Sequence, residues 1–67
     1  MTREEIYNKL QYGDYILIAQ KTGKRSETVR SQIVGRRTLK DNVREAAIEL
    51  ITVREKIEQE FINPNNK

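Results

Sequence analysis

The sequence predicts a small all-α domain of four helices, and three observations support this prediction. Apolar residues recur at spacings of three and four positions, which is the period of a helix rather than of a strand. Glycines fall between these segments, where helices commonly end. The chain has 67 residues and no cysteine, so one domain must gain its stability from helix packing or oligomerisation. We expect that domain to cover residues 1–62, with a polar tail over residues 63–67.

The first helix is expected over about residues 2–10. Thr2 and Glu5 match the capping-box pattern, in which each side chain bonds the backbone amide of the other residue. Ile6 and Leu10 lie four positions apart and therefore share one face of the helix. These features together place the start and the buried side of the helix.

A second helix is expected over about residues 15–22, after a break at Gly13. Asp14 is a suitable N-cap for it, because its short carboxylate accepts from free amides. Ile18 and the small Ala19 lie on the face expected to be buried. The helix is expected to end before Gly23, a residue that adopts the left-handed conformation at low cost.

The third helix is expected over residues 26–34, with Ser26 as its N-cap and Gly35 where it ends. Val29 and Ile33 lie four positions apart and mark its buried face. The fourth helix is expected over residues 41–61 and is by far the longest. Arg54 interrupts its apolar row, which otherwise comprises Val43, Ala47, Leu50, Ile57 and Phe61.

Positive charge is concentrated in the middle of the chain. Residues 20–40 carry a net charge of +6, whereas residues 1–19 carry −1 and residues 41–67 carry −2. Like charges at this density repel one another, and a polyanionic partner would offset that cost. Four of the seven bases in the segment are arginines, whose planar guanidinium suits bidentate contacts to guanine and phosphate.

Residues 18–37, "IAQKTGKRSETVRSQIVGRR", resemble the helix-turn-helix motif of phage-repressor and Cro-like regulators, the lambda-repressor-like type. The resemblance is carried by Ala19, Gly23 and Val29, which stand where the motif has its close helix contact, its left-handed turn and a core residue. A preceding helix favours the phage-repressor type over the lac-repressor type. Lys24 and Gln32 depart from the pattern, since the family usually has aliphatic residues there.

The resemblance implies sequence-specific binding of double-stranded DNA by a small phage- or bacterial-type transcriptional regulator. The helix over residues 26–34 would enter the major groove. Residues expected to face the bases are Arg25, Ser26, Glu27, Thr28, Arg30 and Ser31. Residues expected to hold the phosphate backbone are Lys24, Arg36, Arg37 and Lys40. Arg30 suits a bidentate guanine contact, and Glu27 suits cytosine N4.

The long helix is expected to exceed the globule formed by the other three. Its 21 residues correspond to roughly 31 Å. Val53, Ile57 and Phe61 in its C-terminal half are therefore interpreted as a homodimer interface. A contact within a larger complex is the alternative for these three residues.

Several function classes are disfavoured. Without histidine or cysteine, the chain lacks the commonest general base and the thiolate metal ligands, and it has no phosphate-cradling glycine loop. Glu4, Glu5 and Asp14 are interpreted as charges favoured at helix starts. We therefore expect no enzymatic activity, metal, cofactor or small-molecule substrate. The N-terminus shows no secretory pattern and no apolar run is long enough to span a bilayer, so we expect a cytoplasmic protein.

Two alternatives to DNA binding remain open. The same fold could serve as a protein-interaction module, of the antitoxin or anti-repressor type, whose basic centre meets an acidic protein. RNA binding is the other alternative. It is less favoured because no aromatic residue among residues 20–40 could stack on a splayed base.

Overall fold

The structure is a computed structural model that describes residues 1–62, and it confirms the all-α class. It contains four helices in chain order: α1 (Arg3–Lys9), α2 (Asp14–Thr22), α3 (Ser26–Val34) and α4 (Asp41–Ile62). No strand occurs within the described residues. The predicted polar tail over residues 63–67 lies outside them.

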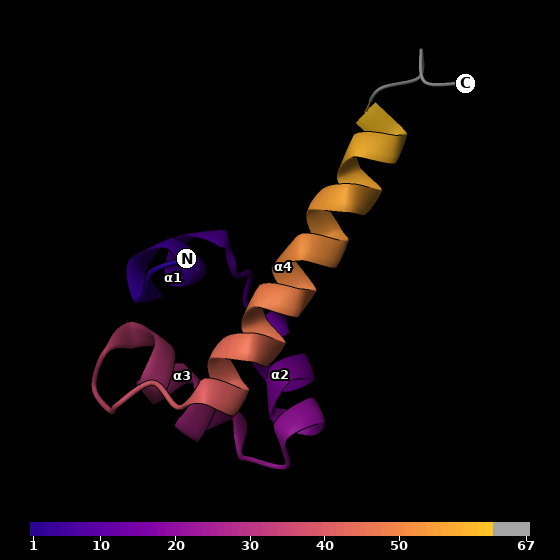
Figure 1. Cartoon of the computed structure of the whole chain (residues 1–67). Coiled ribbons are helices and arrows are strands. Elements are labelled where there is room, and N and C mark those ends of the chain that lie inside the picture. Colours follow the sequence, from indigo (N-terminus) through magenta and orange to yellow (C-terminus); the bar gives the residue numbers. More distant parts are fainter. Residues whose placement is uncertain (63–67) are drawn as a thin grey trace.

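Helix α4 organises the molecule (Figure 1). It packs against α1 and α2, and these two helices in turn pack against α3. The C-terminal half of α4 extends beyond the three short helices, so the molecule is elongated, with extents of 43 × 21 × 19 Å (Figure 1). Since α3 rests on α1 and α2, its opposite face is directed away from the core.

The core is small and built from short side chains. Its nine buried apolar residues are Ile6, Ile18, Ala19, Val29, Ile33, Val43, Ala46, Ala47 and Ile51. Of the residues predicted to be buried on the first three helices, Ile6, Ile18, Ala19, Val29 and Ile33 are among them. Leu10 is only half-buried and packs against the cluster from its edge. No aromatic side chain is buried within the described residues, and the chain's single phenylalanine, Phe61, is 82% exposed.

The capping box at the start of α1 is confirmed. The Thr2 amide donates to Glu5 Oε1 at 2.8 Å, and the Glu5 amide donates to Thr2 Oγ1 at 3.2 Å. The bonds donated by the amide and hydroxyl of Thr2 lower the pKa of the Glu5 carboxyl. Two free amides of the first turn are therefore satisfied by side chains, as the spacing predicts.

The predicted N-caps of α2 and α3 are wrong by one residue. Gly13 and Arg25 occupy the cap positions, and neither makes a side-chain cap bond. Ser26 is the first residue of α3. Asp14 is the first residue of α2, and its carboxylate instead accepts from the Gln11 amide at 2.6 Å, which closes the preceding turn.

Asp14 also forms the most deeply buried ion pair among the described residues. Its second carboxylate oxygen accepts from the Arg54 guanidinium of α4, and the Asp14 and Arg54 side chains are 5% and 23% exposed. Burial raises the pKa of the Asp14 carboxyl, but the bonds from Arg54 and from the Gln11 amide outweigh burial, so the pKa lies below its ordinary value. The arginine that interrupts the apolar row of α4 thus ties α4 to the start of α2.

Candidate nucleic-acid interface

Helices α2 and α3 are joined by a tight connection of three residues, Gly23, Lys24 and Arg25. Gly23 has φ of +71°, the left-handed conformation that the sequence predicts there. The amide of Lys24 donates to the carbonyl of Ala19 at 3.1 Å, which satisfies the end of α2. Ala19 is buried, in agreement with the need for a small side chain there. The two helices are therefore held in a fixed mutual orientation.

Helix α3 has a buried and an exposed face. Val29, Gln32 and Ile33 are buried. On the opposite side, Glu27, Arg30 and Ser31 line one hollow, which is completed by Val34, Arg36 and Tyr7 of α1. Ser26 lies in the adjoining hollow, which also includes Glu27 and Arg30. The structure thus brings four of the six predicted base-facing residues onto one continuous surface.

The other two predicted base-facing residues lie at its margins. Arg25 is exposed at the N-cap, and Thr28 is half-buried at the border between the two faces of α3. Neither lines any of the three hollows that contain Arg30. Arg30 lines all three hollows, and one of them also includes Tyr7 and Asn8 of α1.

The loop after α3 has a defined shape. The amides of Arg36 and Arg37 both donate to the carbonyl of Ser31, at 2.8 and 3.1 Å. Gly35 has φ of +97°, and the Arg3 guanidinium lies over it while donating to the Ile33 carbonyl at 2.9 Å. The side chains of Arg36 and Arg37 remain exposed. Backbone contacts thus hold two exposed arginines directly beyond the C-terminus of α3.

Gln32 occupies one of the two positions at which the sequence departs from the helix-turn-helix pattern. Its side chain is buried, and its Oε1 accepts from the Lys40 amide at 3.0 Å. A buried amide side chain therefore anchors the end of the loop, a task that an aliphatic residue could not perform. Lys40 itself is exposed, whereas Lys24, the second departure, is half-buried.

The cations of this surface have no carboxylate partners at ion-pair distance within residues 1–62. The ion pairs of that part of the chain join Lys9 to Glu55, Lys21 to Glu49 and Arg54 to Asp14, and all of them involve α4. The bases of α3 and its flanking loops, Lys24, Arg25, Arg30, Arg36, Arg37 and Lys40, take part in none of these pairs. All of these side chains except half-buried Lys24 are exposed, so their charge is directed to solvent.

Three tyrosines beside Arg30 are a feature that the sequence did not reveal. Tyr7 of α1, Tyr12 of the α1–α2 connection and Tyr15 of α2 border the hollows around Arg30. Burial raises the pKa of the Tyr15 hydroxyl, with a further contribution from nearby Tyr7, while Arg30 opposes the shift. No local pattern places these residues beside α3, because only the packing of α1 and α2 on α3 brings them there. Aromatic side chains thus lie beside the basic surface, although none occurs among residues 20–40.

The predicted dimer residues are exposed on the free half of α4. Val53 and Ile57 are each about half-exposed, and Phe61 is more exposed than either.

No group of three or more metal-ligating side chains is found in the part of the chain that the structure describes. Within residues 1–62, none of the helices has the length and apolar character needed to cross a membrane. Comparison with protein-family models, curated proteins and solved structures finds no match to this chain.

Proposed function

We propose that the protein binds double-stranded DNA sequence-specifically and acts as a small transcriptional regulator of the phage-repressor-like type. The observation that carries this proposal is the surface formed by Glu27, Arg30, Ser31 and the two loop arginines. Polar side chains with hydrogen-bonding capacity lie on an exposed helix face, and exposed cations follow directly beyond it. A helix of this kind fits the major groove, with the loop against the adjacent phosphates.

The residues of this surface take different roles. Arg30 donates to guanine O6 and N7, and Glu27 accepts from cytosine N4. Arg36 and Arg37 hold phosphates, with Lys24 and Lys40 in support, and these contacts fix register without reading sequence. One module of this size makes few base contacts, so two copies joined through α4 would read half-sites about 34 Å apart.

The test is a fluorescence-anisotropy titration of a random-sequence duplex at several salt concentrations. Each phosphate contact contributes about −0.9 to the slope of log affinity against log salt, so Arg36→Ala/Arg37→Ala should make the slope shallower by about two units. The matched control is Lys56→Glu, which lowers the net charge by the same two units on the far part of α4, at a residue outside the ion pairs that join the helices. An equal loss in both variants would mean that net charge, rather than this surface, binds DNA.

Sequence reading is tested on a preferred site selected from a random library. Arg30→Ala should weaken binding to that site by about 1–3 kcal/mol and leave binding to random duplex within a few-fold of wild type. Equal losses on both duplexes would assign Arg30 to the phosphate backbone instead.

A second candidate function is the binding of single-stranded nucleic acid, and it is favoured by the positions of Tyr7, Tyr12 and Tyr15. Tyrosine rings stack on unpaired bases at about 1–3 kcal/mol per base. Tyr12 is the most exposed of the three. Under this alternative Tyr12→Leu weakens binding to a single-stranded oligonucleotide, which also binds more tightly than the duplex. No binding to any nucleic acid at low salt would instead assign the basic surface to an acidic protein partner.

A further inference from the structure

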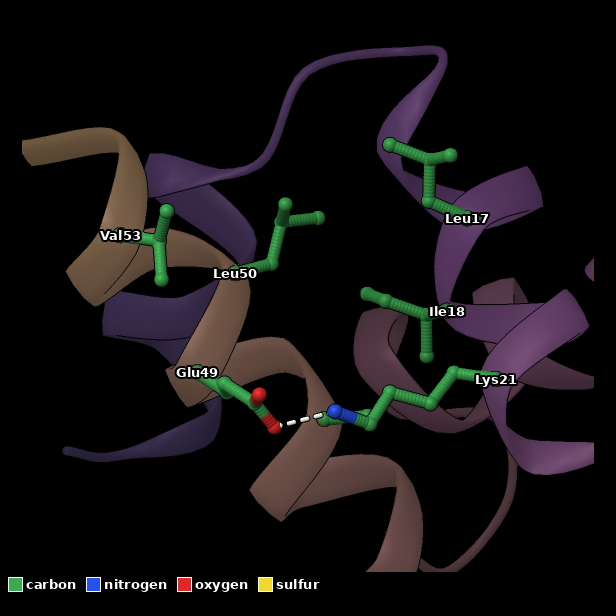
Figure 2. A pocket seen from close by; sticks show the side chains of 7 residues that line it. Leu17, Ile18, Lys21, Glu49, Leu50 and Val53 are labelled. Atoms are coloured by element: carbon green, nitrogen blue, oxygen red, sulfur yellow. Dashed lines mark hydrogen bonds and ion pairs between the residues drawn. The ribbon is translucent and has the colours of Figure 1, made fainter. Parts of the chain in front are cut away.

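An apolar groove runs between α2 and α4, on the molecule's surface away from Arg30. Leu17 of α2 faces Leu50 and Val53 of α4 across it, and the Lys21–Glu49 ion pair lies at one end (Figure 2). Ile18 and Ala46 complete the lining, and the cavity volume is about 180 Å³. Leu17 is 51% exposed, so the groove presents apolar surface to solvent within the described structure.

The apolar row of α4 continues from this groove beyond the globule. At 100° per residue, Leu50, Val53, Ile57 and Phe61 fall within an arc of about 80° on one side of the helix. From Thr52 to Phe61 every side chain except Arg54 is exposed. A helical segment of this length is marginal in water without a packing partner. The groove and the row therefore form one continuous surface that lacks a partner in the single chain.

We propose that a second copy of the chain covers this surface, with the two α4 helices antiparallel and the partner's Phe61 seated in the groove beside Leu17 and Leu50. This inference rests on the homodimer included in the proposed function and specifies its geometry. The core holds nothing larger than isoleucine, and the one phenylalanine is left outside it. A small core of this kind is expected to gain stability through oligomerisation.

The positions of the apolar residues match this arrangement. A two-fold axis between residues 55 and 56 sets Leu50 level with the partner's Phe61, and it sets Val53 within about one helical rise, 1.5 Å, of the partner's Ile57. With this axis, each of the two grooves receives the Phe61 side chain of the other copy, as an isologous interface requires. In a parallel pair each Phe61 would lie about 16 Å along the axis from the other copy's Leu50, and both grooves would stay open.

Charge also favours the antiparallel arrangement. The axis places Arg54 within about one helical rise of the partner's Glu58, and this occurs twice in the dimer. A parallel pair would place Arg54 and the partner's Glu58 on opposite flanks of the helix pair, about 6 Å apart along the axis, so these two charges would not meet. Opposite charges across an interface fix register and orientation, while like charges disfavour it.

The first test is sedimentation equilibrium without DNA. The wild type should be a dimer, and Phe61→Asp and Leu17→Asp should each raise its dissociation constant at least tenfold while circular dichroism stays helical. Ile16→Asp is the matched control, because Ile16 neighbours Leu17 and is about as exposed but lines a hollow near Arg30 instead. Phe61→Ala tests the same contact by removing the aromatic ring without introducing a charge. A monomeric wild type, or equal effects of Leu17→Asp and Ile16→Asp, would overturn the proposal.

The second test determines orientation with spin labels on single cysteines, which the native chain lacks. Lys56→Cys lies next to the proposed axis, so its two labels should be close together. Glu45→Cys lies on the same flank of α4, and its labels should be separated by about 30 Å along the axis. Short distances at both positions would mean a parallel pair. Because neither test uses nucleic acid, its failure is distinguishable from the failure of DNA binding.

Discussion

The ion pair between Asp14 and Arg54 offers a sharp test of how α4 is held against the other helices. We consider two substitutions of similar volume, Asp14→Asn and Arg54→Met. After Asp14→Asn, the new side-chain amide still accepts from the Gln11 amide, and the freed guanidinium, 23% exposed in the wild type, can turn toward water. Arg54→Met instead leaves a carboxylate that is only 5% exposed without its cation. The second substitution should therefore cost more.

The magnitudes follow from this asymmetry of exposure. Losing a hydrogen bond to a charged group should cost about 1–2 kcal/mol of unfolding free energy for Asp14→Asn. Leaving the buried carboxylate unpaired should cost about 2–3 kcal/mol for Arg54→Met, below the range for fully buried pairs because the Gln11 amide still bonds it. For a domain of this size, the larger loss corresponds to a fall in melting temperature of roughly 10–20 °C.

The pH dependence adds a second criterion. In the wild type the folded-state pKa of Asp14 lies below its unfolded value, so the contribution of the pair is present above that unfolded value, about 3.9, and is lost as pH falls through the folded pKa. In Arg54→Met, burial without the cation should raise the pKa of Asp14 instead. Acid then protonates the unpaired carboxylate, and the variant regains part of its lost free energy of unfolding. The deficit of Arg54→Met relative to wild type should therefore shrink between pH 7 and pH 3.

The assay is urea unfolding followed by circular dichroism at one fixed protein concentration, because an oligomer's stability depends on concentration. Both variants and the wild type are measured at pH 7, 5 and 3. A larger cost for Asp14→Asn than for Arg54→Met would refute the reasoning. So would an Arg54→Met deficit that stays constant over this range, since the pair would then contribute through packing alone.

Three further outcomes are expected. Gly35→Ala should cost about 1–2 kcal/mol by urea unfolding, because alanine is strained at φ of +97°, whereas Gly13→Ala, with open space and a helical backbone, should be neutral or stabilising. Gln32→Leu should change global stability by less than about 1 kcal/mol yet speed hydrogen exchange of the Lys40 amide; unchanged exchange would contradict the anchoring role. Ile33→Val should cost about 0.5–1.5 kcal/mol, a fully buried methylene being lost, and a neutral result would mean that Ile33 is not in the core.

Much of the fold could be predicted from the sequence because its signals are local. The capping box needs only Thr2 and Glu5, and the helix ends need only glycines that tolerate a left-handed backbone. The spacing of Val29 and Ile33 identifies the buried face of α3 without knowledge of what covers it. The N-caps of α2 and α3 are specified less sharply, since aspartate and serine suit several positions near a helix start.

The remaining features depend on tertiary contacts. Asp14 looks like a helix-start charge in the sequence, and nothing local relates it to a residue forty positions later. Gln32 has no evident role in a buried position until the loop returns the Lys40 amide to it. Tyr7, Tyr12 and Tyr15 surround Arg30 only because α1 and α2 pack on α3. Each of these features requires two segments to meet, and a single sequence does not specify that meeting.

These contacts explain how a dimer formed by α4 would position α3. Helix α3 packs on α1 and α2, and the ion pairs of Lys9, Lys21 and Asp14 with α4 orient those two helices on it. The separation of two copies of α3 would therefore be set through side chains that do not themselves touch DNA. In the proposed dimer, Arg54 serves on both sides, since it binds Asp14 within the chain and faces the partner's Glu58 across the axis. The residue that interrupts the apolar row is thus the one that would couple the spacing of the two reading helices to the association of the two chains.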